Sequence, residues 1–406
     1  MYFVVVAATV IFAGTYLVLA IGKLPGFRLD RAGAALLGAS LMVACGVLAP
    51  AEAFRAIDGN TLALLLGIMI VVANLRLSGF FRLATNWIAL HARHPLLLLA
   101  AIVCASGLFS AFLVNDTICL VLAPLVLDVT TRLKRDPVPY LLAVAMASNC
   151  GSTATITGNP QNIVIGSLSR IPYGSFAAAL SPIAFVGLAL TIALIALVHP
   201  REFWSHERLA AVPERAASHR PLMIKSLLVT LALVILFFAG AAPAKMAILA
   251  GAFLLLTRIV KSTKVYFEID WPLLVMFAGL FVVVAGFEKT LLSPAAIAAV
   301  RRLHLEQIPV LTAVTAMLSN LVSNVPAVLV LRPFVHALPD RDTAWLTVAM
   351  ASTLAGNFTV LGSVANLIVV QKAATKGVAI GFWDYFRIGA PLTLLTLIFG
   401  ALWLAV

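Results

Sequence analysis

Apolar runs of about 20 residues recur along the whole chain of 406 residues and constrain its fold more than any other feature. A helix of that length crosses the hydrocarbon core of a bilayer, which is roughly 30 Å thick. Only 11% of the residues are charged, whereas soluble domains carry about 25%. The sequence therefore predicts an all-α polytopic membrane protein with the lipid bilayer as its first partner. The continuous runs are 2–22, 32–50, 61–80, 181–200, 222–240, 243–260, 272–290 and 388–406.

The pentapeptide Val-Ala-Met-Ala-Ser occurs at 144–148 and again at 348–352, each time within an apolar segment that carries a polar break. When the two copies are aligned, later polar residues also coincide without a gap. The aligned pairs are Thr155 with Thr359, Gly158 with Gly362, and Asn162 with Asn366. The copied segments, 140–168 and 343–370, are predicted to be broken helices and bring the total to about ten crossings. Two copied breaks indicate one binding site built from both halves.

Two longer segments, 96–131 and 309–338, are each divided near the middle by polar residues, at Asn115-Asp116 and around Asn324. We interpret both segments as re-entrant helical hairpins, whether each arm spans the bilayer or stops at its midplane. A hairpin returns the chain to the side it entered, so each half makes five crossings. An odd number places the second half upside down relative to the first, which predicts two inverted repeats.

The chain thus divides into a first inverted repeat (1–200), a linker (201–221) and a second inverted repeat (222–406). Threading the crossings leaves about 19 Lys and Arg on one side and about 8 on the other, which makes the first side cytoplasmic. Both termini are then expected outside, in a bacterial-type inner (plasma) membrane. This distribution explains the net charge of +12 without nucleic acid as a partner.

The polar breaks have chemistry of their own. The first helix should break near Gly158, with Asn159 capping the second half-helix and Pro160 in its first turn. Ser363 is the matching cap in the second repeat. A half-helix that begins inside the membrane presents N–H groups to an anion, and the preceding half-helix presents carbonyl oxygens that can coordinate a small cation.

Asp116 is the one acidic residue in the middle of either hairpin, and a carboxylate at bilayer depth costs about 2.5 to 3.5 kcal/mol unless it is solvated, paired or protonated. It is predicted to be a cation ligand or a proton carrier; the alternative is a hairpin cap facing a water-filled vestibule. Arg332 is expected to snorkel near the outer interface, with a gate or an anion contact as the alternative. Glu288 and Lys289 are interpreted as a helix-end pair.

Two sets of candidate residues follow, and for any single Ser or Thr helix packing remains the alternative role. The substrate-binding candidates are Asn115, Thr117, Thr155, Thr157, Gly158, Asn159, Asn162, Ser323, Asn324, Thr359, Gly362, Ser363 and Asn366. The coupling-ion candidates are Asp116, Asn115, Ser148, Asn149, Gly158, Asn324, Ser352 and Gly362.

Several classes of function lack the residues they require. The cysteines and histidines show no metal-type spacing, so no disulfide, no zinc and no cofactor are expected, apart from a sodium ion or a proton for coupling. No phosphate-binding loop is present, which disfavours an ATP-driven pump, although a separate ATPase could dock on the cytoplasmic face. No nucleophile elbow or paired carboxylates support an intramembrane enzyme. A passive channel remains an alternative.

Four motifs together resemble the ion transporter superfamily, in particular its arsenite permease, NhaD-type sodium/proton antiporter and citrate-transporter-like branches, and more distantly the divalent anion/sodium symporters. The motifs are Val114-Asn115-Asp116-Thr117, the segment 151–162, Val322-Ser323-Asn324 and the segment 356–366. The resemblance implies a homodimer that works by an elevator mechanism. It also implies a scaffold domain and a transport domain, each drawn from both repeats, with sodium and substrate at the hairpin tips and broken helices.

Residues and resemblance together predict a secondary active transporter of a small anion or oxyanion, such as arsenite or a carboxylate, coupled to protons or sodium. The Asn-Asp tip is closer to the arsenite and antiporter branches than to sodium-coupled carboxylate carriers. A sodium/proton antiporter is the alternative function, and the direction of transport stays open.

Overall fold

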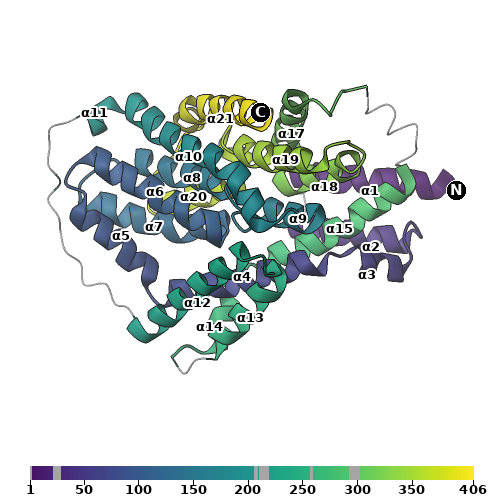
Figure 1. Ribbon diagram of the computed structural model, residues 1–406, viewed down its shortest axis with the longest axis horizontal. Helices are drawn as coiled ribbons and strands as arrows, with labels where there is room; N and C mark the ends of the chain where they lie inside the picture. Colours follow the sequence, from purple (N-terminus) through teal and green to yellow (C-terminus); the bar gives the residue numbers. More distant parts are fainter. Residues whose placement is uncertain (1, 22–28, 205–208, 210–218, 257–258, 292–301) are drawn as a thin grey trace.

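The computed structural model describes residues 2–21, 29–204, 209, 219–256, 259–291 and 302–406. Within these residues the regular structure is helical, with no strand (Figure 1). The first repeat contains α1 (Tyr2–Ile21), α2 (Arg31–Ala44), α3 (Pro50–Ala56), α4 (Gly59–Leu77), α5 (Phe80–His91), α6 (Pro95–Leu113), α7 (Asn115–Arg132), α8 (Pro137–Ser152), α9 (Pro160–Ser169), α10 (Tyr173–Val198) and α11 (Pro200–Phe203). The second contains α12 (Arg220–Phe238), α13 (Pro243–Leu255), α14 (Ser262–Phe267), α15 (Trp271–Leu291), α17 (Ile308–Val322), α18 (Asn324–Val335), α19 (Arg341–Ala355), the 3-10 turn η1 (Val360–Gly362), α20 (Val364–Ala374) and α21 (Phe382–Leu404).

In the described part of the chain, 7 helices are long and apolar enough to cross a membrane: α1, α4, α6, α10, α12, α15 and α21. The predicted run 32–50 is shorter as a helix, because α2 ends at Ala44, the chain turns at Gly46 with φ +71°, and Pro50 starts α3. The sequence did not indicate α3, α5, α11 or α14. Most of the predicted linker 201–221 lies outside the described residues.

Both segments predicted to be hairpins form two packed helices joined by a sharp turn, and the two units differ in length. α6 and α7 reverse at Val114 (φ 60°), and α17 and α18 reverse at Ser323 (φ 79°). The arms of the first hairpin have 19 and 18 residues, or about 28 Å at 1.5 Å per residue. Those of the second have 15 and 12 residues, or about 20 Å. The first hairpin can therefore extend nearly through a bilayer, whereas the second stops well short.

The helices sort into two packing groups (Figure 1). In the first group, α2 packs on α15, α4 packs on α13, α1 lies against α2 and α15, and α12 lies against α4 and α13. In the second, α6, α7, α8 and α10 pack with α17, α19, α20 and α21, and α9 and α18 lie against α19. We refer to them as the outer-helix group and the hairpin group.

The outer-helix group has an internal twofold relation. A Cβ on Gly67 of α4 would lie 2.3 Å from the carbonyl carbon of Ala247 on α13. A Cβ on Gly279 of α15 would lie 2.6 Å from the carbonyl carbon of Ala35 on α2. The spacing in sequence between Gly67 and Gly279 equals that between Ala35 and Ala247, so these are equivalent positions of the two repeats. Each contact therefore joins one helix of the first repeat to one helix of the second. Small residues at these crossings let the helix backbones approach closely.

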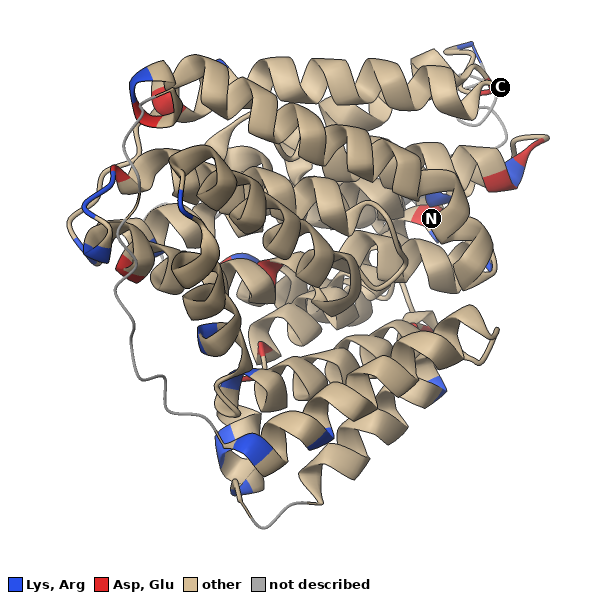
Figure 2. Cartoon of the chain, turned by 60° about the vertical axis from the view of Figure 1, so that its left-hand side comes forward, with Lys and Arg blue, Asp and Glu red and all other residues tan. Residues whose placement is uncertain are grey.

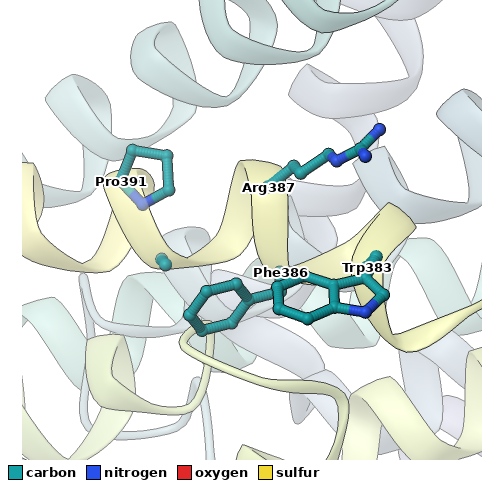
Figure 3. A pocket seen from close by; sticks show the side chains of 5 residues that line it. Trp383, Phe386, Arg387 and Pro391 are labelled. Carbon is teal, nitrogen blue, oxygen red and sulfur yellow. The ribbon is translucent and has the colours of Figure 1, made fainter.

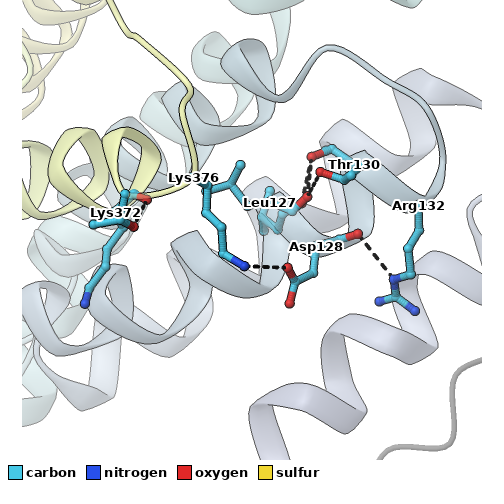
Figure 4. A network of polar contacts seen from close by, with 9 residues as sticks. Leu127, Asp128, Thr130, Arg132, Lys372 and Lys376 are labelled. Carbon is cyan, nitrogen blue, oxygen red and sulfur yellow. Dashed lines mark hydrogen bonds and ion pairs between the residues drawn. The ribbon is translucent and has the colours of Figure 1, made fainter.

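Charged side chains lie mainly at helix ends and in connections (Figure 2). At the end of α7, the Asp128 carboxylate lies 3.9 Å from Lys376 Nζ, in the turn that follows α20 (Figure 4). Glu288 and Lys289 lie at the end of α15, as predicted, and each binds a different element: Lys289 Nζ binds Glu52 of α3 at 2.7 Å, and Glu288 binds Arg332 of α18. Side chains one residue apart on a helix point in different directions, so each finds a partner on another element.

Aromatic side chains gather at the start of α21. Trp383, Phe386, Arg387 and Pro391 line a shallow depression, with the Arg387 guanidinium directed away from the rings (Figure 3). Phe382 stacks on Phe386 with ring centroids 5.4 Å apart. Exposed aromatic rings beside a cation are typical of a helix end at the membrane–water interface.

Candidate functional site

The two broken helices end and restart as the caps predict. α8 ends at Ser152 and α9 begins at Pro160, where the Asn159 side chain accepts the N–H of Asn162 at 2.8 Å. In the second repeat the Ser363 hydroxyl accepts the N–H of Ala365 at 3.3 Å at the start of α20. Each break therefore leaves a short loop between two half-helices in the interior of the hairpin group.

A side-chain amide closes the loop of the first repeat. Asn162 Nδ2 donates to the carbonyl oxygens of Ser152 at 3.2 Å and Thr155 at 3.0 Å. Within the same loop, Gly158 passes so near the end of α8 that a Cβ would lie 2.1 Å from Ser152 O. Its own carbonyl accepts the backbone N–H of Asn115, at the first hairpin tip, at 2.8 Å.

The second repeat contains the same closure at the aligned residues. Asn366 Nδ2 donates to Gly356 O at 2.7 Å and to Thr359 O at 3.1 Å. A Cβ on Gly362 would lie 2.8 Å from Gly356 O. The duplication in sequence is therefore also a duplication of local structure. We call these two closures the amide clamps of Asn162 and Asn366.

Asn149 on α8 connects the first hairpin to the second break. It is fully buried, and its Oδ1 accepts from Asn115 Nδ2 at 3.0 Å and from Ser363 Oγ at 3.1 Å. Its Nδ2 donates to the Oδ1 atoms of Asn357 at 2.9 Å and Asn366 at 3.0 Å. One side chain of the first repeat thus holds three residues of the second.

Thr353 on α19, which aligns with Asn149, makes the reciprocal connection. Its Oγ1 accepts from Asn159 Nδ2 and from Gln161 Nε2, both at 3.1 Å. Ser363 and Asn159 are themselves aligned, so the contact of Ser363 with Asn149 and the contact of Asn159 with Thr353 are related by the internal twofold. This buried network is built from residues of both halves, and it is our candidate for the predicted single site.

The second hairpin tip joins the network through Asn324. With its amide nitrogen facing the acceptors around it, Asn324 donates to Ser352 O at 3.2 Å and Gly362 O at 3.3 Å, and it accepts from Gln161 Nε2 at 3.2 Å. Ser319, one turn before the tip, lies 2.7 Å from the same amide. Both hairpin tips therefore reach a break glycine, Asn115 through its backbone and Asn324 through its side chain.

Several predicted residues do not join the network through their side chains, although the carbonyl oxygens of Thr155, Ser352 and Thr359 belong to it. The hydroxyl of Thr155 donates to Ala111 O on α6, and Thr157 Oγ1 lies 2.7 Å from Tyr173 Oη, so both face away from the network. Ser148 and Ser352 donate to carbonyl oxygens of their own helices. Thr117 and Thr359 make no side-chain hydrogen bond within the described residues, and Ser323 forms the second hairpin turn.

Sequence reasoning missed three members of the network: Gln161, Thr353 and Asn357. Thr353 could have been found, because it follows the second Val-Ala-Met-Ala-Ser directly, as Asn149 follows the first. Gln161 lies inside one of the four motifs, although no role was predicted for its side chain. Asn357 also lies inside one of the four motifs, but the contacts of its amide with Asn149 and Met146 of α8 depend on the other repeat.

Asp116 is half-buried in the first turn of α7, and the backbone N–H of Ala365 at the start of α20 acts electrostatically on its carboxylate. The charged side chains that act on it are Arg31 at the start of α2 and Asp270 before α15, both in the outer-helix group. The carboxylate therefore occupies the positive end of α20, one of the two predicted anion positions. The residues of the network are otherwise amides and hydroxyls, without charge.

Two buried amide oxygens, Asn115 Oδ1 and Asn162 Oδ1, have no donor within the described residues. Buried acceptors without a partner are uncommon, and carbonyl-type oxygens are suitable ligands for a small cation. Both belong to the first repeat, beside the Gly158 break.

Arg332, which was expected to snorkel near the outer interface, forms an ion pair with a residue of α15. Its Nε donates to Glu288 Oε1 at 2.9 Å and its Nη2 to Glu288 Oε2, a two-point pair between α18 and α15. Beside it, Tyr16 of α1 donates to Pro326 O at 3.2 Å. These contacts attach the second hairpin to the outer-helix group.

A family model described as citrate transporter matches residues 16–355. An uncharacterised transporter of Mycobacterium bovis is 31% identical, over 98% of this chain and 97% of its own length. The silicon efflux transporter LSI3 of Oryza sativa is 29% identical, over 98% and 96%. A putative transporter, arsB, of Dictyostelium discoideum is 23% identical, over 92% and 86%.

Two solved structures share the fold. The YdaH transporter of Alcanivorax borkumensis aligns with a TM-score of 0.62 and 16% identity over 98% of this chain and 97% of its own. MtrF of Neisseria gonorrhoeae, described as one of a class of antimetabolite efflux pumps, aligns with a TM-score of 0.64 and 13% identity over 99% and 94%. With the family model spanning both hairpins and the first break, the chain belongs to the citrate transporter family of membrane transporters.

Proposed function

We propose that this secondary transporter exports a small oxyacid of low charge, such as arsenite, in exchange for protons that Asp116 carries. The observation that supports the proposal is the charge of the network between the two repeats. Its residues are uncharged amides and hydroxyls, and in the part of the chain that the structure describes the carboxylate beside them is Asp116, at the hairpin tip.

The neutral network favours a substrate with hydroxyl groups and at most one negative charge. Amides and hydroxyls both donate and accept, so they can replace the water around a molecule such as an uncharged oxyacid. A citrate trianion would bring three negative charges to a site whose neighbouring titratable group, Asp116, is an acid. The free energy needed to bury such charges without a cation is far larger than the stabilisation that two half-helix N-termini provide.

Asp116 supports proton coupling because its acceptor role depends on its charge. As a carboxylate it is stabilised by the N–H of Ala365 at the positive end of α20, and there it can also accept a hydrogen bond from a hydroxyl of the substrate. Protonation removes the negative charge that strengthens this bond, so the substrate is released. Proton binding and substrate binding then exclude each other at one carboxylate, as exchange requires.

The direction of transport is inferred from the relatives. One relative is named a silicon efflux transporter, and dissolved silicon at neutral pH is an uncharged hydroxy acid. Another is named arsB. The first name supports export, and its substrate agrees with a site made of amides and hydroxyls.

Sodium is the alternative coupling ion, and a sodium/proton antiporter is the second candidate function. The observation that favours sodium is the pair of buried oxygens without donors, Asn115 Oδ1 and Asn162 Oδ1, beside the carbonyl-rich break at Gly158.

The expected movement is an elevator in which the hairpin group slides against the outer-helix group, within the expected homodimer. The side-chain bonds that join the two groups in the described residues are few, chiefly the Arg332–Glu288 pair and the Tyr16 hydroxyl. Movement would break these contacts and leave the dense network inside the hairpin group intact.

The test is flux in proteoliposomes with an imposed pH gradient or an imposed sodium gradient. Arsenite, silicic acid, sulfate and citrate are compared as substrates. Wild-type protein should exchange arsenite or silicic acid for protons. Asp116→Asn should abolish this exchange, whereas Asp128→Asn, which removes an exposed acid at the other end of α7, should retain it.

Wild-type proton-driven flux in Asp116→Asn would refute the coupling assignment. Citrate flux above arsenite flux would refute the substrate class and leave the role of Asp116 standing. Sodium-driven proton flux without any oxyacid would establish the antiporter instead.

A further inference from the structure

A cavity of about 640 Å³ lies between α4, α9, the start of α10, and the connection from α12 to α13. It is separate from the amide network, and its walls come from both helix groups: α4, α12 and α13 on one side, α9 and α10 on the other (Figure 1). By the predicted topology it faces the outer leaflet. We propose that this cavity binds an anionic phosphate group, and that the head of an outer-leaflet lipid supplies it.

Two cations line the cavity. Arg170 follows α9 in the left-handed conformation (φ 59°), and Lys245 lies in the first turn of α13. Neither has an acidic partner in the described part of the chain, and no Asp or Glu lines the cavity. The acid next to the lining, Asp58, accepts from Asn60 N–H at 3.0 Å and from Thr61 Oγ1 at 2.7 Å, so it is occupied in capping α4.

Neutral donors extend the polar part of the wall. Asn60 lies at the start of α4, and Ser167 lies in the last turns of α9. Two unpaired cations with an amide and a hydroxyl match the oxygen atoms of a phosphate, since charge-assisted bonds from Arg and Lys to phosphate are among the strongest that side chains make.

The rest of the wall is apolar. Leu64, Ile163 and Phe237 line it, each strongly buried by the protein. A free inorganic anion has no apolar surface to bury against this wall. The glycerol and first methylenes of a phospholipid do bury apolar area against it, which favours their binding. The volume is that of an ordinary small-molecule site and exceeds the needs of one phosphate ion. The combination favours a lipid head with part of its chains.

The cavity bears on movement because it spans the boundary between the two groups. Arg170 belongs to the half-helix that starts at the first break, and Lys245 belongs to the outer-helix group. An anion held by both cations links the two groups at that position. Its binding does not depend on which substrate the transporter carries, so failure of the proposed function would leave this inference untouched.

The experiment compares wild-type protein with the double variant Arg170→Gln/Lys245→Gln. A matched control, Arg302→Gln/Arg341→Gln, removes two exposed cations outside the cavity from the same predicted face. Each purified protein is titrated with phosphatidylglycerol, phosphatidylcholine or inorganic phosphate, and both the melting temperature and the lipids retained in native mass spectrometry are measured.

Phosphatidylglycerol should raise the melting temperature of the wild type and the control in a saturable way, and phosphatidylcholine should not. Because each basic residue near a membrane surface contributes substantially to anionic lipid binding, the double variant should bind phosphatidylglycerol about tenfold to thirtyfold more weakly. A response to inorganic phosphate alone would support the anion site and reassign its source. Equal responses to both lipids, or an unchanged response in the double variant, would overturn the proposal.

Discussion

Replacing Asn366 by alanine should destabilise the protein more than replacing Asn162, although the two amides occupy the same place in the two repeats. Both side chains are fully buried, and each donates two hydrogen bonds to carbonyl oxygens of its own loop. The truncation removes the same atoms from each, so the packing losses cancel to first order. The two variants differ in how many of the groups that lose a hydrogen bond to the asparagine keep another hydrogen-bond partner.

After Asn162→Ala, both carbonyl oxygens keep another donor: Ser152 O keeps Asn159 Nδ2 at 3.3 Å, and Thr155 O keeps Gly158 N–H at 3.3 Å. Asn162 Oδ1 accepts no bond, so its loss leaves no donor unpaired. The cost is then two net hydrogen bonds, about 1 to 3 kcal/mol.

After Asn366→Ala, Thr359 O keeps Gly362 N–H at 3.0 Å. Gly356 O is left without a side-chain donor, and Asn149 Nδ2 loses one of its two acceptors. A buried acceptor without a donor costs about 1 to 3 kcal/mol, and the lost hydrogen bond of Asn149 costs about 1 kcal/mol more. Asn366→Ala should therefore lower the free energy of unfolding by about 2 kcal/mol or more beyond the effect of Asn162→Ala.

The assay is reversible unfolding in mixed micelles with increasing denaturing detergent, read by circular dichroism. A double-mutant cycle with Asn149→Ala isolates the contact that only Asn366 makes. It should give a coupling of about 1 kcal/mol with Asn366→Ala and none with Asn162→Ala. Equal destabilisation by the two single variants would refute the reasoning, because it would mean that the connection between repeats contributes nothing.

Two further predictions use pairs of sites within this chain. Gly158→Ala should lower the melting temperature more than Gly362→Ala, since the added Cβ would lie 2.1 Å from a backbone oxygen in the first and 2.8 Å in the second; the reverse order in a thermal-shift assay would contradict the steric argument. A double-mutant cycle on Glu288 and Arg332, whose side chains are 24% and 21% exposed, should give a coupling near 1 kcal/mol, above that of the exposed pair of Glu52 and Lys289 at 44% and 48%; equal couplings would show that the contact between helix groups is no stronger than a surface pair.

Features of the fold and of the candidate site that are set by neighbouring residues in the chain could be predicted from sequence, whereas features set by tertiary packing could not. Asn159 and Ser363 were identified as caps because a cap is set by its own backbone and the next three residues. The hairpin turns followed from the polar residues inside long apolar segments. Thr155 and Thr157 were expected in the site on the same grounds, yet their hydroxyls face Ala111 and Tyr173, because packing against α6 and α10 decides where a loop side chain points.

By itself the sequence determined the membrane environment, the duplication, the two hairpins, the two breaks and the residues that cap them. Each of these follows from apolar length, from backbone preferences or from alignment of the chain with itself. Only the tertiary structure decided which amides meet at Asn149 and Thr353, that Asp116 lies at the start of α20, and that Glu288 pairs with Arg332. Those contacts join residues far apart in the chain, so they depend on how the helices of one repeat are inserted among those of the other.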